Sequence, residues 1–262
     1  SDGDWDQSDT YWKSKEFLAW LYNESPVKDT VVVNDRWGRD IMGKHGGFMT
    51  YADNFEPGHL MDRKWENCMT LDQNAWGYRR DMNSSDVYTV KELIGELVMT
   101  ISCGGNFLLN IGPNKYGTIA PIFEDRLRQL GQFVNVHEEA IFGTKPWIHQ
   151  NDTQIIWYTS SVKNSRALDP NRLFNPQNRD NTVIYAWVLE FPQSNFVELP
   201  SVTVTEDTNI QLLGTPLKLV GKQGPEGAMV DMSPVRWVDF PSKDAFILRI
   251  ENAADSDHNP LE

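Results

Sequence analysis

The stretch Thr89-Val-Lys-Glu-Leu-Ile-Gly-Glu-Leu-Val-Met-Thr-Ile-Ser-Cys-Gly-Gly-Asn-Phe-Leu-Leu-Asn-Ile-Gly-Pro113 holds a helix signal followed directly by a strand signal. Thr89 and Glu92 have the spacing of a capping box, and the apolar residues after them recur at i, i+3, i+4 and i+7. A Gly-Gly pair at 104–105 ends this pattern. The apolar run 106–113 then reads as a short buried strand, so the stretch predicts an α/β arrangement.

The same alternation extends on both sides of this stretch. Apolar periodicity predicts a helix over 10–22, the β-branched run 30–33 is typical of a strand buried on both faces, and 64–70 is a further candidate strand. Pro121 suits the first turn of another helix. Helices that alternate with buried strands predict a mainly parallel sheet. Residues 1–143 would then supply about four strand units, the C-terminal half of a (β/α)8-like barrel.

Beyond residue 143 the pattern changes to short alternating segments without helical periodicity. We predict a β-sandwich over 144–251 and a disordered tail over 252–262. The polar stretch 161–181 reads as a long exposed loop. The expected strand segments are 153–160, 182–190, 198–205, 209–213, 217–221 and 245–250.

Composition narrows the possible functions of the chain. A net charge of −13 opposes binding to nucleic-acid phosphates, and no apolar run is long enough to predict a membrane-spanning helix. The two cysteines, Cys68 and Cys103, lack metal-binding spacing, so no structural zinc site is predicted and each is expected to be a buried thiol and not a disulfide partner. The 10 tryptophans suit either sugar stacking or a large aromatic core.

Three N-glycosylation sequons permit a secreted or lysosomal protein. They begin at Asn23, Asn83 and Asn151, and Pro26 makes the first a poor acceptor. The chain opens on a polar Ser-Asp-Gly without an initiator Met or a signal peptide. We therefore expect a fragment or a processed chain whose upstream part is absent.

Two clusters of polar and aromatic residues are candidates for chemistry. Ser-Asp-Gly-Asp-Trp (1–5) places two carboxylates beside an indole ring, as a sugar-cleaving site requires, although Asp-Gly-Asp also forms solvated turns. Asn-Asp-Arg-Trp-Gly (34–38) follows the predicted strand 30–33, where α/β barrels place their active sites. A capping turn before a helix is the alternative for this second cluster.

Several motifs in the same order make the chain resemble the animal α-L-fucosidases of glycoside hydrolase family 29. The resemblance covers essentially the whole chain and implies a catalytic barrel followed by a C-terminal β-sandwich. It further implies a retaining exo-glycosidase that removes terminal α-L-fucose from glycans through a covalent fucosyl-enzyme intermediate. The motifs are Ser-Asp-Gly-Asp-Trp (1–5), Ser-Pro-Val-Lys-Asp (25–29), Val-Val-Asn-Asp-Arg-Trp-Gly (32–38), His-Gly-Gly (45–47), Lys-Trp-Glu (64–66), Trp-Gly-Tyr-Arg-Arg-Asp (76–81), Gly-Gly-Asn-Phe-Leu-Leu-Asn-Ile-Gly-Pro (104–113) and Lys-Pro-Trp (145–147).

The resemblance assigns the nucleophile to Asp2 and leaves the acid/base open. A retaining enzyme needs a second carboxyl group about 5–5.5 Å from the nucleophile. Asp53 is preferred because a carboxyl group on a loop can lie over the leaving-group oxygen. Glu66, on a predicted strand, is the alternative, unless it is a buried structural acid paired with Arg79 or Arg80. Glu56 is a weaker third candidate.

Three further residues are expected to contact the sugar. Arg36 matches a sugar-binding arginine of the family, with a salt bridge to Asp35 or Asp40 as the alternative. Trp76 matches an aromatic residue that packs on the fucose methyl group, with core packing as the alternative. His45 is expected to line the site or to lie on a surface loop. The resemblance implies no metal and no organic cofactor.

The resemblance also defines what this chain lacks. The first half of the family's barrel, which carries further sugar contacts, has no counterpart here. A half barrel leaves strand edges open, so the expected partner is the N-terminal half of the same protein, as a separate chain or as part of a longer one. Fucosylated glycans are the expected substrates, and homo-oligomerisation is left open. The rival readings are a non-catalytic carbohydrate-binding or structural fragment, and an exo-glycosidase of another specificity.

Overall fold

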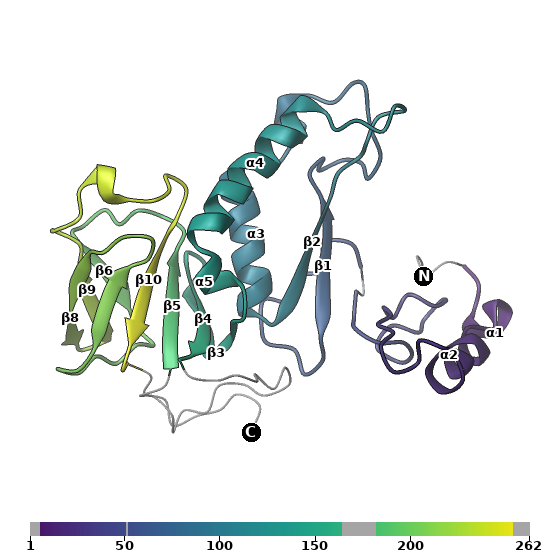
Figure 1. Ribbon diagram of the computed structural model, residues 1–262, viewed down its shortest axis with the longest axis horizontal. Helices are drawn as coiled ribbons and strands as arrows, with labels where there is room; N and C mark the ends of the chain where they lie inside the picture. Colours follow the sequence, from purple (N-terminus) through teal and green to yellow (C-terminus); the bar gives the residue numbers. More distant parts are fainter. Residues whose placement is uncertain (1–5, 51, 164–181, 254–262) are drawn as a thin grey trace.

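The computed structural model describes residues 6–50, 52–163 and 182–253 and arranges them in layers (Figure 1). Helices α3 and α4 lie between a small parallel sheet and a large antiparallel sheet. In chain order the elements are α1 (Asp9–Trp12), α2 (Ser14–Asn23), β1 (Trp65–Thr70), η1 (Ser84–Asp86), α3 (Val90–Ser102), β2 (Gly105–Asn110), α4 (Pro121–Val136), α5 (Glu138–Ile141), β3 (Lys145–Thr153), β4 (Ile156–Val162), β5 (Thr182–Val188), β6 (Phe196–Leu199), β7 (Asn209–Leu212), β8 (Lys218–Gly224), β9 (Gly227–Asp231), η3 (Trp237–Asp239) and β10 (Phe246–Glu251).

The helix and strand predicted from the stretch 89–113 are both confirmed. Thr89 Oγ1 accepts a hydrogen bond from the Glu92 backbone amide, and the Glu92 carboxylate accepts one from the Thr89 amide at 2.7 Å, which completes the capping box. Pro121 occupies the first turn of α4, as expected. These local signals succeed because each acts within its own element: the capping box satisfies free backbone amides, and proline has no amide hydrogen that would be left unpaired in the first turn.

β1 and β2 form a parallel pair whose register runs from Trp65 opposite Gly105 to Thr70 opposite Asn110. One face of the pair packs against α3 and α4, where Trp65 and other apolar residues are buried. Gly105 permits this packing, because an added Cβ atom would lie 2.6 Å from the Trp65 ring. The opposite face carries polar residues and Leu108, which is 38% exposed.

Two expectations for the N-terminal part are wrong. Within the described residues the parallel sheet has two strands, and 30–33 is not one of them: Thr30 lies in a turn and Val32 is 76% exposed. The predicted helix 10–22 is divided into α1 and α2 by Lys13, whose φ of 54° lies in the left-handed region. Apolar sequence alone does not produce a strand, because its backbone groups need a neighbouring strand to pair with.

The C-terminal part is one eight-stranded antiparallel sheet in the order β3-β4-β5-β10-β7-β8-β9-β6. The sheet curls around a core, as a β-sandwich does. Inward-facing residues from both ends of the strand order meet in this core, including Trp147 of β3 and Tyr158 of β4 from one end and Val197 of β6 and Val230 of β9 from the other. A C-terminal sandwich-type domain, as predicted, is therefore present, while the domain boundary near residue 143 stays a prediction.

β5 joins the two halves of the structure because both of its faces are buried. Ile184 and Ala186 point into the core of the curled sheet, whereas Tyr185 and Trp187 point toward the helices and share a core with Trp65 of β1. Because successive side chains of a strand point to opposite faces, the side chains of β5 contribute alternately to two different cores.

Several strand boundaries differ from the predicted ones. The segment expected over 153–160 corresponds to β4 at Ile156–Val162, and the strand expected over 198–205 lies at Phe196–Leu199. Neither β3 nor β9 was predicted. Residues 161 and 162 belong to β4 and not to a loop, and the remainder of the loop predicted over 161–181 lies outside the described residues, apart from Lys163. β9 escapes detection because Ala228, Met229 and Val230 are three consecutive apolar residues, so the outward-facing Met229 hides the alternation between buried and exposed positions.

The predicted tail is ordered at its first two residues. Asn252 donates a hydrogen bond to the Asp207 carbonyl at 3.1 Å and its own carbonyl accepts one from Thr208, while Ala253 is buried. Residues 254–262 lie outside the described part of the chain. Cys103 is a buried thiol, as expected, whereas the Cys68 thiol is only half-buried, contrary to the prediction. In the described ranges no helix has both the length and the apolar character needed to cross a bilayer.

Candidate active site

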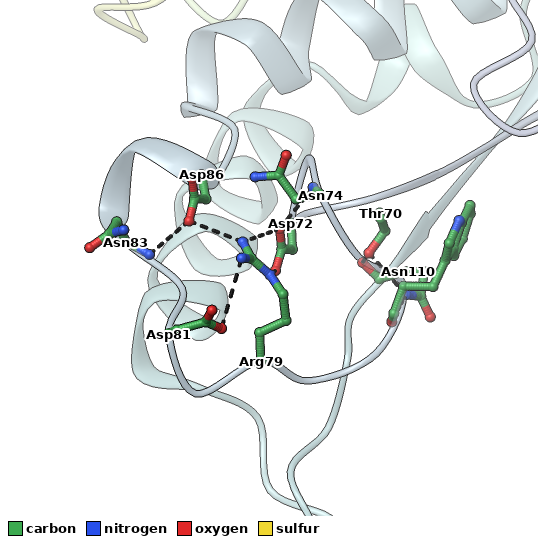
Figure 2. Close-up of polar contacts among 9 residues, drawn as sticks. Thr70, Asp72, Asn74, Arg79, Asp81, Asn83, Asp86 and Asn110 are labelled. Atoms are coloured by element: carbon green, nitrogen blue, oxygen red, sulfur yellow. Dashed lines mark hydrogen bonds and ion pairs between the residues drawn. The ribbon is translucent and has the colours of Figure 1, made fainter.

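The carboxyl ends of β1 and β2 lie side by side and carry a hydrogen-bonded polar pair (Figure 2). The Asn110 amide nitrogen donates to Thr70 Oγ1 and to the Trp76 backbone carbonyl, both at 2.9 Å. The loop that follows β1 is thereby attached to the end of β2. In α/β folds of parallel strands this edge is where ligands bind.

An arginine with two carboxylate partners organises the rest of this loop. The Arg79 guanidinium binds both oxygens of Asp72, at 2.8 and 2.9 Å, and reaches Asp86 at 3.0 Å (Figure 2). Asp72 is only 2% exposed, and its hydrogen bonds with Arg79 lower the pKa of its carboxyl group. The pKa of Asp86 is also lowered, first by the backbone amide of Asn83 and then by Arg79. All three groups are therefore held in their charged forms.

Trp76 lies in this loop with its side chain partly in solvent. It is 39% exposed and does not belong to either buried core, which removes the core-packing alternative for this residue. Its backbone is held through Asn110, whose role the sequence did not reveal. The position of Asn110 in the sequence could have indicated this role. It is the last residue of β2, and polar residues at the carboxyl end of a parallel strand lie at the edge where ligands bind.

Arg36 and Asp53 are brought together, although they are 17 positions apart in the sequence. Arg36 Nη2 lies 2.8 Å from Asp53 Oδ1, and the same guanidinium donates to the hydroxyl and carbonyl of Thr50. Asp35, one of the partners considered for Arg36, is buried and accepts hydrogen bonds from the backbone amides of Gly43 and Thr50.

Glu66 lies on the exposed face of β1 but far from its carboxyl end. Its Oε2 accepts a 2.7 Å hydrogen bond from Asn106 on β2. Four residues separate it from Thr70, which is roughly 13 Å along a strand. The pairing with Arg79 considered from the sequence is wrong, because that guanidinium is bound to Asp72 and Asp86.

Glu56 lies on the other side of β1, against α3. Asn67, which is fully buried, donates to Glu56 at 3.3 Å and to Glu96 at 3.4 Å. Burial first, and the neighbouring Glu56 carboxyl second, raise the pKa of Glu96 to about 8. Glu56 and Glu96 therefore form a carboxyl pair in the helix layer, separate from the edge that carries Trp76.

His45 joins its loop to α1. Its Nε2 lies 2.8 Å from Asp9 Oδ2, and this contact, followed by the one with Lys15, lowers the pKa of Asp9 to about 2. Asp2 and Asp4 lie outside the described residues. Within the described ranges no group of three or more His, Cys, Asp and Glu side chains is arranged to hold a metal ion.

Comparison with known proteins identifies the family. The family described as Alpha-L-fucosidase matches residues 1–139, and the one described as Alpha-L-fucosidase C-terminal domain matches residues 150–251. The chain belongs to the α-L-fucosidase family. The predicted resemblance is thus confirmed, and it holds for both halves of the chain.

The relatives of this α-L-fucosidase family member extend over its whole length. A Caenorhabditis elegans protein provisionally named an α-L-fucosidase is 53% identical over 266 residues, covering 100% of this chain and 55% of the relative. Rattus norvegicus tissue α-L-fucosidase is 43% identical over 253 residues, covering 95% of this chain and 51% of the relative. The chain therefore spans about half the length of the curated relatives it matches.

A solved structure shows the same fold. The α-L-fucosidase isoenzyme 1 of Paenibacillus thiaminolyticus superposes with a TM-score of 0.74 at 20% identity, over 97% of this chain and 57% of that chain. This similarity extends over both sheets and the helices between them.

Proposed function

We propose that the full-length protein containing this chain is a retaining α-L-fucosidase that removes terminal α-L-fucose from glycans. The observation that carries the proposal is the family match over both halves of the chain, together with polar and aromatic residues at the carboxyl ends of β1 and β2. The test is release of the aryl alcohol from an aryl α-L-fucoside by the full-length protein, with other aryl glycosides as controls. Turnover of another glycoside with no turnover of the fucoside would overturn it.

We further propose that β1, α3, β2 and α4 are units of a (β/α)8-like barrel. Support comes from the parallel β1–β2 register with α3 as the crossover, and from the face of this pair that remains open to solvent. The N-terminal half of the same protein would supply the strands that cover this face. The measurement is co-expression of the two halves as separate chains. Co-purification of the two chains would support the proposal, and their failure to co-purify would contradict it.

In this mechanism Asp2 is the nucleophile. Its carboxylate attacks the anomeric carbon while the acid/base protonates the departing oxygen; the acid/base then deprotonates the water that attacks the same carbon and releases Asp2. Asp2→Asn should abolish turnover of the fucoside. Added azide should then displace the aryl alcohol directly and give the β-fucosyl azide, which reports attack from the face that Asp2 used.

Asp53 is the proposed acid/base and Glu66 the alternative. The Asn54 amide donates to the Cys68 carbonyl at 2.9 Å, so the loop with Asp53 runs along β1 only two residues from Thr70. Glu66 lies near the amino end of β1, and its carboxylate already accepts a hydrogen bond from Asn106. Asp53 is also held 2.8 Å from Arg36, the proposed sugar-binding arginine.

Two substrates separate the candidates. In the full-length protein, Asp53→Asn should reduce kcat/KM for a fucosyl disaccharide about 10²–10⁴-fold. An aryl fucoside with an acidic leaving group needs no protonation and should lose much less. Azide should rescue this variant through the intermediate and give the α-fucosyl azide. Glu66→Gln is the matched variant, and the same behaviour there, with Asp53→Asn unaffected, would transfer the role to Glu66.

The remaining proposals concern substrate binding and cellular location. Arg36 is proposed to bind sugar hydroxyl groups, Trp76 to face the fucose methyl group and His45 to support the site through Asp9. We also propose a lysosomal or secreted protein that carries glycans at Asn83 and Asn151, both of which are exposed. A mass decrease on enzymatic removal of N-glycans, lost in Asn→Gln variants at these positions, is the check.

A further inference from the structure

The loop that carries Trp76 is attached to the rest of the protein at three separate points. It leaves β1 at Thr70 and returns toward η1 at Ser84. Such a loop would be free to move if its two ends were its only restraints. One attachment is made at Trp76 itself, one just after it, and one between the two ends of the loop, and each has a different physical basis.

The first attachment is a side-chain amide that binds the Trp76 backbone. Asn110 Nδ2 lies 2.9 Å from the Trp76 carbonyl and 2.9 Å from Thr70 Oγ1 (Figure 2). Because the two contacts use both donor directions of one amide, the orientation of Asn110 is determined by β1 and is passed on to Trp76.

The second attachment is a close approach of two backbones. A Cβ atom on Gly112 would lie 2.6 Å from the Gly77 carbonyl carbon and 2.7 Å from the Tyr78 amide nitrogen. Only a residue without a side chain lets the peptide between Gly77 and Tyr78 lie against the segment that follows β2. The position of this peptide is therefore set by contact with main-chain atoms, which cannot rotate away.

The third attachment is the buried ion pair of Arg79. Its guanidinium binds both oxygens of Asp72, two residues after β1, and also binds Asp86 of η1. The end of the loop is thus tied to its beginning and to the helical turn beyond it. A bidentate arginine pair fixes direction as well as distance.

We propose that Asn110, Gly112 and Arg79 are positioning residues that set the selectivity of the full-length protein for a 6-deoxy sugar over its 6-hydroxylated counterpart. They act through the indole ring of Trp76, and the proposal rests on the α-L-fucosidase function proposed above. An apolar wall held against the C5 substituent excludes the hydroxyl group of an L-galactoside, whereas a wall that moves leaves room for that group and for water.

The experiment compares kcat/KM for an aryl α-L-fucoside and the matching aryl α-L-galactoside in the full-length protein. Trp76→Ala sets the scale, and we expect it to reduce the fucose preference about 10–100-fold. Gly112→Ala and Asn110→Asp should each reduce the preference about 5–20-fold, mainly through a higher KM for the fucoside. Arg79→Lys keeps the charge but loses the bidentate geometry, and should reduce it by a smaller factor.

Gly131→Ala is the matched control for Gly112→Ala. It adds the same methyl group to a glycine of α4 where nothing lies within 4 Å, so the fucose preference should stay unchanged. The unfolding temperature of each variant is measured in parallel. Where Gly112→Ala fails to fold, Asn110→Asp carries the test alone, because it keeps the size of the side chain.

A double-mutant cycle separates positioning from a general structural effect. In the Trp76→Ala background, Asn110→Asp should change the preference no further, because there is no ring left to position. An undiminished effect in that background would overturn the proposal, as would an unchanged preference in Gly112→Ala and Asn110→Asp where Trp76→Ala lowers it. A wild-type protein that fails to cleave fucosides would instead overturn the proposed function itself.

Discussion

The small parallel sheet and the large antiparallel sheet of this protein differ in how many of their faces are covered. β5 of the large sheet is buried along its whole length, with one face in the core of the curled sheet and the other against the helices. β1 and β2 bury one face only, and the other presents Leu108 and a row of polar side chains to solvent. Both sheets use the same helices as cover.

This difference shows which part of the fold is self-sufficient. The antiparallel sheet curls and so provides its own second layer, which requires no chain from elsewhere. A parallel pair cannot do this, because each further strand needs its own crossover connection. The polar residues of the proposed active site lie on the incompletely covered sheet, where we propose that the N-terminal half of the protein adds further strands.

The largest effect is expected from the face of β5 that points toward the helices. Trp187→Ala should lower the free energy of unfolding by about 3–5 kcal/mol, because it removes a fully buried indole whose Nε1 donates to Thr159. Trp237→Ala, at an exposed position of the same part, should cost less than about 1 kcal/mol. Urea unfolding measures both.

The same experiment tests whether the helices and the large sheet form one cooperative unit. Hydrogen exchange should speed up in α3 and α4 as well as in β5 when Trp187 is truncated, since all of them share one core. Faster exchange confined to β5 would show that the two sheets unfold separately.

A smaller loss is expected from the ion pair beside β1. Asp72→Asn should cost about 1–3 kcal/mol, since it weakens the partnership of Arg79, which keeps Asp86. The pKa of Asp72 is lowered in the folded protein, so its contribution is present above the ordinary carboxyl range and is lost as the pH falls. The difference between wild type and variant should therefore shrink in acid, as followed by urea unfolding between pH 7 and pH 3.

The contribution of the Glu56–Glu96 carboxyl pair to stability should change with pH in the opposite direction to that of Asp72. Because the pKa of Glu96 is raised to about 8 in the folded protein, folding favours its protonated form, and this contribution falls as the pH rises from about 4.5 to about 8. Glu96→Gln mimics the protonated form and should flatten this fall, gaining on the order of 1 kcal/mol at pH 8 after allowance for partial solvent screening. An unchanged pH slope in the variant would contradict the raised pKa of Glu96.

The smallest effect distinguishes the open face from a covered one. Leu108→Ser should change the stability of this chain by no more than about 0.5 kcal/mol, because the side chain is already partly in solvent. In the full-length protein, where we propose that the first half of a barrel covers this face, the same change should cost about 1–3 kcal/mol. Equal effects in both proteins would argue against that cover.

Much of this fold follows from local patterns, and the errors arise where a pattern needs a distant partner. The capping box at Thr89 and the proline at 121 predicted α3 and α4 correctly, since their hydrogen bonds are made within the element. The run 30–33 has the composition of a buried strand but lacks a ladder in the described part of the chain. Its strand character depends on neighbours that composition does not encode.

The candidate site divides in the same way. Motifs in the sequence indicated Arg36, Asp53 and Trp76 individually, but the 2.8 Å contact between Arg36 and Asp53 arises from the path of the intervening loop. Asn110 was hidden inside an apolar motif, and only its place at the end of β2 reveals it. Gly112 is informative only once Gly77 is known to lie against it.

By itself the sequence determined the helices α3 and α4, the strands that flank them, the free thiols and the family, because these follow from spacing, caps and motif order. The tertiary structure decided which face of each strand is buried and which side chains meet. The physical reason is that contacts between distant segments depend on how the loops close and on which backbone groups find partners, and neither is contained in a local pattern.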